Sequence, residues 1–239
     1  MNIECTGKLY DILNQEIFAQ PGDVTLNNCI GQRFIGAGAE DRTITINGIP
    51  GNALGAYLNG ANIVVNGNAQ DATGDTMNAG RIVIHGRCGD AAGYAMRGGE
   101  IFIEGDVGYR AGIHMKAYRD KYPVLVFGGR SGSFLGEYQA GGLIIALGLH
   151  CREDEIIGNF CATGMHGGRI MIRADRLCAR ISKQIESRRA IDEDMALAAP
   201  YIKAYCAYFH VPEEAIYNKS FFVLTPNSSN PYKQLYIQN

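Results

Sequence analysis

The stretch Arg81–Gly112, RIVIHGRCGDAAGYAMRGGEIFIEGDVGYRAG, contains one pattern twice. In each copy two isoleucines are separated by one residue, first Ile82 and Ile84 and then Ile101 and Ile103, and glycines follow at matching distances. The copies are 19 residues apart, and a fixed period of this size is typical of repeat architectures. This repeat therefore decides the fold class.

Two glycine ladders extend the period along the chain. Both advance by 19 residues; the first consists of Gly36, Gly55, Gly74, Gly93 and Gly112, and the second of Gly48, Gly67, Gly86 and Gly105. The first ladder then takes one longer step to Gly136, and its five additional residues fall in the polar segment HMKAYRDKYP. Copies of the strand resume at residues 125–127, 144–146 and 170–172, and residues 20–33 hold a degraded turn.

Each copy holds one short alternating strand bounded by glycines, with no room for a helix, which disfavours a βαβ sheet and leucine-rich repeats. A unit this small cannot bury its own apolar face, so it must stack on its neighbours. The sequence predicts an all-β solenoid, a single-stranded parallel β-helix of about seven 19-residue coils. Equivalent residues should then lie about 4.8 Å apart.

The equivalent positions of successive coils indicate a core. Leu58, Met77, Met96 and Met115 occupy one column. A soft-ligand stripe facing a cofactor is the alternative, but methionine commonly fills irregular core gaps, so we assign this column to the core. The ladder glycines are expected at sharp turns, which need a positive φ or a close approach of two backbones. Because no GxGxxG opens a helix and no GxxxxGK[ST] is present, the glycines do not predict a phosphate-binding loop.

Helical segments are predicted on both sides of the repeat. Leu9–Phe18 has the apolar spacing of a short helix that caps one end of the solenoid, where a polar outer face is needed. Ala174–Ser187 also has apolar residues at helical spacing. Asp192 is the expected N-cap of a further helix, which Pro200 should bend or break. Phe221–Thr225 is predicted as a strand.

The end of the repeat divides the chain into two predicted parts at residue 175. Residues 1–175 are the predicted β-helix domain with its N-terminal cap, and residues 176–239 are a helical extension and tail. The tail packs either on the rod or on a partner, and its aromatic residues are Phe221, Phe222, Tyr232 and Tyr236.

The composition is that of a soluble globular protein, with 46% hydrophobic and 19% charged residues. A net charge of −2 gives no basic field, so neither nucleic acid nor a membrane surface is an expected partner. The longest apolar run is too short to cross a bilayer, and residues 1–20 lack the pattern of a signal peptide. The seven cysteines form no CxxC pair. We therefore expect reduced thiols, no Fe–S cluster in this chain and a cytoplasmic location.

No catalytic, cofactor-binding or metal-binding residue is predicted. Four potential metal ligands lie close in the sequence without a standard zinc spacing: His150, Cys151, Cys161 and His166. Asp71 and Asp90 stack one period apart. A solvated turn is favoured over acid–base work or calcium binding there, because no wider acidic cluster accompanies them. The sequence also lacks GxSxG and an evident Cys–His pair.

The repeat resembles a known domain. The segments GAYLNGANIVVNGNAQDATGDTMNAGRIVIHG and AGYAMRGGEIFIEGDVGYRAGIHM are similar to the C-terminal GXGXG domain of the glutamate synthase large subunit. They resemble one of the subunits of formylmethanofuran dehydrogenase less closely. The resemblance covers about residues 30 to 175, although the glycines are spaced and no literal G-x-G-x-G string occurs. It implies a right-handed parallel β-helix that is non-catalytic and packs between a glutaminase domain and an FMN-binding synthase domain.

The resemblance also implies partners. The family's amidotransferase uses a cysteine as its first residue, whereas this chain begins Met-Asn-Ile-Glu-Cys, and no barrel-like alternation for FMN and Fe–S sites is present. We expect a structural subunit of a glutamate synthase-type oxidoreductase complex in glutamate biosynthesis. Its partners would be glutaminase-type and FMN-synthase-type subunits, which would hold the FMN and Fe–S cofactors, with no cofactor in this chain. Formation of a homo-oligomer stays open.

Two alternatives accompany this interpretation. The first is a non-catalytic component of a formylmethanofuran dehydrogenase or methylglutamate synthase-type complex, which neighbouring genes would distinguish. The second is a stand-alone β-helix enzyme, such as a polysaccharide lyase or an acyltransferase. The six-residue sub-period of hexapeptide acyltransferases is absent, and we expect no glutaminase or glutamate synthase activity from the isolated chain.

Overall fold

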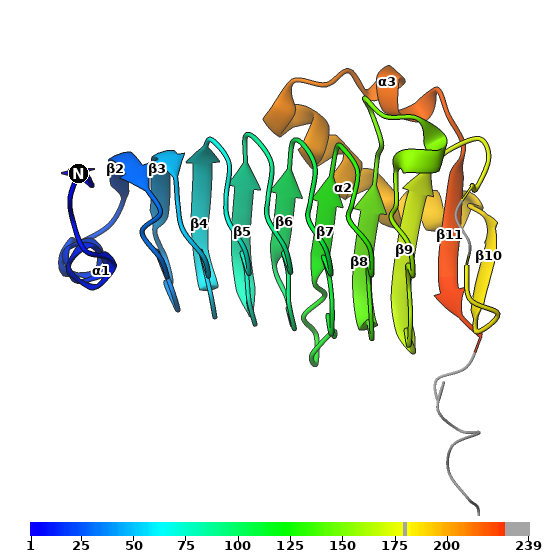
Figure 1. The fold of residues 1–239 in the computed structure, drawn as a ribbon, viewed down its shortest axis with the longest axis horizontal. Coiled ribbons are helices and arrows are strands. Elements are labelled where there is room, and N and C mark those ends of the chain that lie inside the picture. The colour runs from blue at the N-terminus through cyan, green and yellow to red at the C-terminus, as the bar shows by residue number, and fades with distance from the viewer. Residues whose placement is uncertain (179–180, 228–239) are drawn as a thin grey trace, which may run out of the picture.

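A computed structural model describes residues 1–178 and 181–227 of the chain. Parallel strands stack in one row along a rod (Figure 1). The row consists of β1 (Asn2–Glu4), β2 (Val24–Ile30), β3 (Thr43–Ile49), β4 (Asn59–Asn66), β5 (Ala79–Ile84), β6 (Glu100–Ile103), β7 (Val124–Phe127), β8 (Ala140–Ala146) and β9 (Gly167–Arg173). The predicted parallel β-solenoid is confirmed, with about eight turns in place of about seven. The degraded turn at residues 20–33 contains β2, which pairs in parallel with β3, with a register shift between Leu26 and Cys29.

The register follows the repeat. Ile63 pairs with Ile82 and Ile82 with Ile101, so equivalent residues of successive coils lie side by side. Inward-facing residues of the strands are fully buried, and so are Leu58, Met77, Met96 and Met115. The methionine column is therefore core, as predicted.

The glycines of the first ladder lie in turns where the residues at alternate positions have positive φ. Its six glycines have φ between 62° and 70°, and the residues two positions before and after each also have positive φ. In one such turn Gly74 N–H donates to Leu54 O of the preceding coil, whereas Ala72 N–H and Thr76 N–H donate to carbonyls of the following coil. The alternation therefore lets one segment bond to both neighbours.

The second ladder serves close approach between coils. A Cβ on Gly67 would lie 2.4 Å from the carbonyl oxygen of Gly48, and one on Gly86 would lie 2.7 Å from that of Gly67. Gly86 and Gly105 do not have positive φ. Positive φ accounts for every glycine of the first ladder, and close approach of two backbones accounts for the second, in which Gly48 and Gly67 also have positive φ.

The C-terminal segment adds two antiparallel strands to the same sheet. After β9 come β11 (Phe221–Pro226) and then β10 (Ile185–Arg189) in the sheet order. The predicted strand Phe221–Thr225 is confirmed. The helix predicted over Ala174–Ser187 is wrong, since the described residues there form no helix and enter β10. Pairing with the edge of β11 satisfies backbone groups, and this tertiary contact overrides the local apolar spacing.

In residues 1–178 and 181–227, two longer helices and two short ones complete the fold. They are α1 (Tyr10–Ala19), the 3₁₀ turn η1 (Glu153–Glu155), α2 (Asp192–Phe209) and α3 (Glu213–Tyr217). As predicted, α1 lies at the first end of the rod (Figure 1). Its outer face is mixed and not uniformly polar, because Leu9, Ile12 and Phe18 are exposed alongside Asp11 and Gln15.

Helix α2 differs from its prediction in two details. Its N-cap is Ile191, and Asp192 is the first helical residue. The carboxylate of Asp194 accepts the Ile191 N–H at 3.0 Å. Pro200 lies inside α2 on its exposed side, and the helix continues through it to Phe209. Burial of the opposite, apolar face of α2 offsets the one backbone hydrogen bond that the proline removes.

A second apolar layer forms where α2 crosses the outer faces of β5 to β9 (Figure 1). Strand β7 is buried on both faces, so all four of its residues are inaccessible. The hydroxyl of Tyr205 donates to Glu104 O at 2.9 Å and fixes the helix against the coils. The proposed boundary at residue 175 falls between β9 and β10 and stays a prediction. Across residues 1–178 and 181–227, no helix combines the length and apolar character needed to cross a membrane.

Candidate functional site

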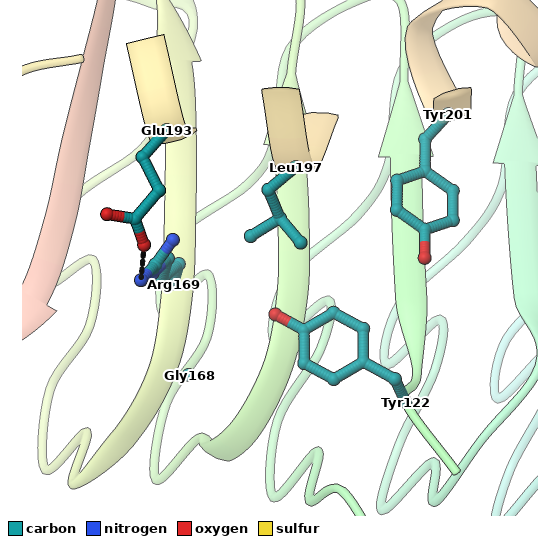
Figure 2. A pocket seen from close by; sticks show the side chains of 6 residues that line it. All are labelled: Tyr122, Gly168, Arg169, Glu193, Leu197 and Tyr201. Atoms are coloured by element: carbon teal, nitrogen blue, oxygen red, sulfur yellow. Dashed lines mark ion pairs between the residues drawn. The ribbon is translucent and has the colours of Figure 1, made fainter. Parts of the chain in front are cut away.

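One hollow lies between α2 and the sheet, with a volume of about 650 Å³. Glu193, Leu197 and Tyr201 are spaced four residues apart on α2, so they face it together. Arg169 comes from β9, and Tyr122 comes from the loop before β7, as Figure 2 shows. The Arg169 guanidinium lies 3.8 Å from the Glu193 carboxylate. Because Gly168 also lines this hollow, part of its floor lacks side chains.

The charges beside this hollow hold α2 in place. Asp194 is 1% exposed, and its carboxylate lies 2.6 Å from Arg188 and 3.4 Å from Arg169. The hydrogen bond from Arg188 is the main cause that lowers the pKa of Asp194, and the Ile191 N–H and the charge of Arg169 act in the same direction. These contacts outweigh burial, which acts in the opposite direction.

The two tyrosines of the hollow are poor bases. Burial raises the pKa of Tyr122 and of Tyr201, so both hydroxyls stay protonated at neutral pH. With an uncharged pair of phenols and an arginine already paired to glutamate, the hollow suits contact with a ligand or a partner side chain. Neither phenol supplies a group for proton abstraction.

A second hollow of about 350 Å³ lies near the ends of strands β5 to β7. Its lining residues are Arg87, Glu104, Gly105, Asp106, Gly129, Arg130, His150, Cys151 and Glu155. Asp106 lies between Arg87 at 3.9 Å and Arg130 at 3.7 Å. Burial raises the pKa of the Cys151 thiol, and the charges of Asp106 and Glu155 raise it further. Since the thiolate is the nucleophile, Cys151 is poorly suited to attack a substrate at neutral pH.

The four potential metal ligands of the sequence do not meet. His150 and Cys151 line the second hollow, whereas Cys161 lies in the core of the solenoid. Burial raises the pKa of Cys161 to about 12. In the part of the chain that the structure describes, no three His, Cys, Asp or Glu side chains are grouped so that they could hold a metal ion.

The stacked carboxylates have a structural role. Asp71 Oδ1 accepts the Asp90 N–H at 2.8 Å, and Asp90 Oδ1 accepts the Tyr109 N–H at 2.8 Å. Each side chain therefore caps a turn of the next coil. This arrangement agrees with the turn interpretation, since each carboxylate is occupied by a backbone donor.

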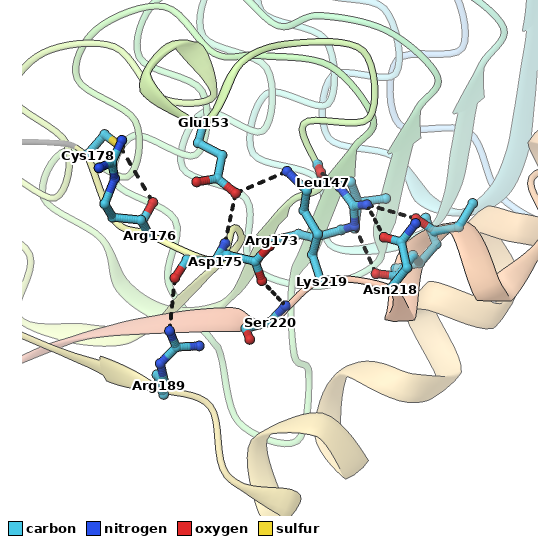
Figure 3. A network of polar contacts seen from close by, with 12 residues as sticks. Leu147, Glu153, Arg173, Asp175, Arg176, Cys178, Arg189, Asn218, Lys219 and Ser220 are labelled. Carbon is cyan, nitrogen blue, oxygen red and sulfur yellow. Dashed lines mark hydrogen bonds and ion pairs between the residues drawn. The ribbon is translucent and has the colours of Figure 1, made fainter.

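A polar network that the sequence did not predict anchors the C-terminal segment (Figure 3). Arg173 is 5% exposed at the end of β9. Its guanidinium donates to Ile216 O at 2.8 Å, to Asn218 Oδ1 at 2.7 Å and to Leu147 O at 3.2 Å. Burial lowers the pKa of Arg173. The sequence contained one signal for this network. Arg173 directly follows Ile172, and the equivalent position one coil earlier holds the apolar Leu147, so the arginine occupies a position that is apolar in the preceding coil.

Comparison with known proteins places these features in one family. The chain matches the GXGXG motif family over residues 22–224. It is 42% identical over 241 residues to a protein of Methanocaldococcus jannaschii described as uncharacterized, and the match covers 98% of this chain and 92% of that protein. The family match spans the coil strands β2 to β9 and also α2 and α3. The chain therefore belongs to the GXGXG family, the family of the glutamate synthase C-terminal domain.

Proposed function

We propose that this chain is a structural subunit of a glutamate synthase-type complex. It holds a glutaminase-type subunit and an FMN-synthase-type subunit in register, so that ammonia passes from one to the other. The observation that carries the proposal is the family match over residues 22–224. In this arrangement FMN and Fe–S cofactors belong to the partner subunits, and the assembly works in glutamate biosynthesis in the cytoplasm.

The geometry of the rod supports a positioning role. Successive coils share one register and hydrogen bond on both sides, so the surface keeps a fixed spacing. Its thiols support a non-catalytic role, because burial raises the pKa of Cys29 and Cys88 to about 12 and raises that of Cys151. Thiols of this kind are not activated nucleophiles.

Co-expression tests the proposal. A tagged form of the full chain would be produced with the glutaminase-type and FMN-synthase-type subunits of the same genome. We expect all three to elute together from a sizing column in a fixed ratio, and glutamine-dependent glutamate formation to require this chain. The chain alone should show neither activity.

Two outcomes would contradict the proposal. One is coupling of the two catalytic subunits at the same rate without this chain. The other is capture of formylmethanofuran dehydrogenase subunits in preference to glutamate synthase-type subunits when both sets are offered.

A further inference from the structure

The five-residue insertion before β7 forms one wall of a small hollow. Tyr118 N–H donates to Lys121 O at 3.2 Å and Lys121 N–H donates to Tyr118 O at 3.0 Å, so the insertion closes as a tight turn. This loop extends below the neighbouring coils in Figure 1. The hollow has a volume of about 370 Å³, and its lining residues are Ala95, Arg97, His114, Lys116 and Tyr118. Insertions in repeat proteins are often found on the binding face.

Two cations are stacked in this hollow. Arg97 follows Gly93 by four residues and Lys116 follows Gly112 by four, so they occupy the same position in adjacent coils. Both side chains are exposed. Within residues 1–178 and 181–227, neither has a carboxylate within ion-pair distance.

Two other arginines of the rod are neutralised by a carboxylate of the next coil. Arg81 lies 2.6 Å from Glu100 and Arg110 lies 3.1 Å from Glu137, each pair joining adjacent coils. Like charges at neighbouring positions repel each other. The two cations of the hollow therefore repel each other unless an anion lies with them.

Flat rings adjoin the cations. The His114 ring stacks on that of Tyr138 at 5.1 Å and 11°, and Tyr94 approaches its edge at 6.0 Å. On the other side the Arg119 guanidinium lies over the Tyr118 ring at 5.1 Å from the centroid. The volume falls in the range of small-molecule sites, which is roughly 300–1,000 Å³.

We propose that this hollow binds a small molecule bearing a phosphate or carboxylate group. Arg97 and Lys116 donate charge-assisted hydrogen bonds to its oxygens, while His114 and Tyr118 flank the remainder. The ligand contacts this chain alone, so the inference does not depend on assembly with catalytic subunits.

Titration of the full chain tests the site. Inorganic pyrophosphate and glutarate would be added separately in about 0.15 M salt, with binding followed by calorimetry and by the NMR signals of the His114 ring. We expect saturable binding of at least one probe, with the His114 signals moving in step with the heat. The probe that binds more tightly identifies phosphate or carboxylate as the natural group.

Variants locate the binding. The double variant Arg97→Gln, Lys116→Gln should weaken binding by about tenfold or more, because it removes both positive charges that contact the anion. Without ligand, its midpoint of thermal unfolding should equal or exceed that of the parent chain, since the repulsion is removed. Lys203→Gln, which removes one exposed cation of α2 outside the hollow, is the matched control and should bind as the parent chain does.

Three results would overturn the proposal. The first is saturation by neither probe. The second is equal weakening in the Lys203→Gln control. The third is binding of a polyglutamate peptide with no binding of either small anion, which would assign the hollow to docking of an acidic protein segment.

Discussion

At the scale of single residues, the glycine in the middle of most coil turns meets two separate requirements, one of backbone conformation and one of space. Gly74 has φ +70°, and a Cβ there would lie 2.4 Å from Ile101 Cδ1 of the following coil. Gly93 also has φ +70°, but the nearest atom to its Cβ position is 3.7 Å away. Ala162 occupies this position in the last coil with φ 59°, where no further coil stacks on it. The positive φ at this position and the space around its Cβ are therefore separate requirements, which substitutions at different coils can distinguish.

Alanine substitution at these two positions should give different losses. Both variants place alanine at positive φ, which costs roughly 1–2 kcal/mol. Gly74→Ala should lose about 1–3 kcal/mol more in the free energy of unfolding, because the buried Ile101 side chain must move. Urea unfolding followed by circular dichroism measures both losses.

A third variant tests the cause of the difference. Ile101→Val removes the Cδ1 atom, so in this background Gly74→Ala should cost no more than Gly93→Ala. Equal losses for the two glycine variants in the parent chain would show that crowding does not fix glycine at position 74.

At the scale of elements, α2 is attached by apolar burial along its length and by one carboxylate at its start. Tyr205 and Ile202 are fully buried against the outer faces of the strands. At the first turn Asp194 accepts hydrogen bonds from Arg188 and Ile191, and its negative charge lies at the positive end of the helix dipole. Removing this charge should loosen the start of the helix without unfolding the coils.

We expect Asp194→Asn to lower the free energy of unfolding by about 1–3 kcal/mol at pH 7, since both arginine partners remain partly solvated. The folded protein holds the pKa of Asp194 below its unfolded value. The stabilisation from this carboxylate is thus complete above the unfolded pKa of about 3.9, and it is lost as the pH falls through the folded pKa. The difference between parent and variant should shrink below about pH 4.

Urea unfolding at pH 7 and at steps from pH 5 to 2.5 checks this dependence. Glu193→Gln is the matched control on the same turn, because Glu193 is 78% exposed and its pair with Arg169 is 3.8 Å long. That variant should change the unfolding free energy by less than about 0.5 kcal/mol. If Asp194→Asn lowered the free energy of unfolding as much at pH 2.5 as at pH 7, the Asp194 carboxylate would not be the source of the stabilisation.

At the scale of the whole molecule, the rod was predictable and its outer layer was not. The coils followed from an unbroken period and from glycines placed where the backbone turns. Nothing periodic linked α2 to the strands, because Tyr205 and its contact Glu104 are 101 residues apart. A local signal was present in β7, whose four consecutive apolar residues indicate burial on both faces. The hollow between α2 and the sheet escaped prediction for the same reason, since Tyr122, Arg169 and Tyr201 come from three distant segments.

The accessibility of the thiols reports the integrity of the whole solenoid. Cys178 is exposed, whereas Cys29, Cys88 and Cys161 are buried in the core. Under alkylation at pH 8 we expect Cys178 to react first, Cys151 more slowly because burial raises its pKa, and the core thiols only as the rod unfolds. Mass spectrometry of timed digests gives the order. Reaction of Cys151 as fast as Cys178 would indicate an activated thiol in the second hollow and would favour a catalytic role.

The alternating turn has a consequence for the length of the protein. Because each coil donates hydrogen bonds to both neighbours at fixed positions, adding or removing a strand in register requires a whole coil. A coil is 19 residues long between Gly36 and Gly112 and longer in the later coils that carry insertions. Strands β2 to β4 lie beyond the reach of α2 (Figure 1), so that end of the rod is where such changes meet least resistance. Each added or deleted coil would move one end relative to the other by about 4.8 Å. The length of the rod therefore changes in steps of one coil, by gene duplication and not by point substitution.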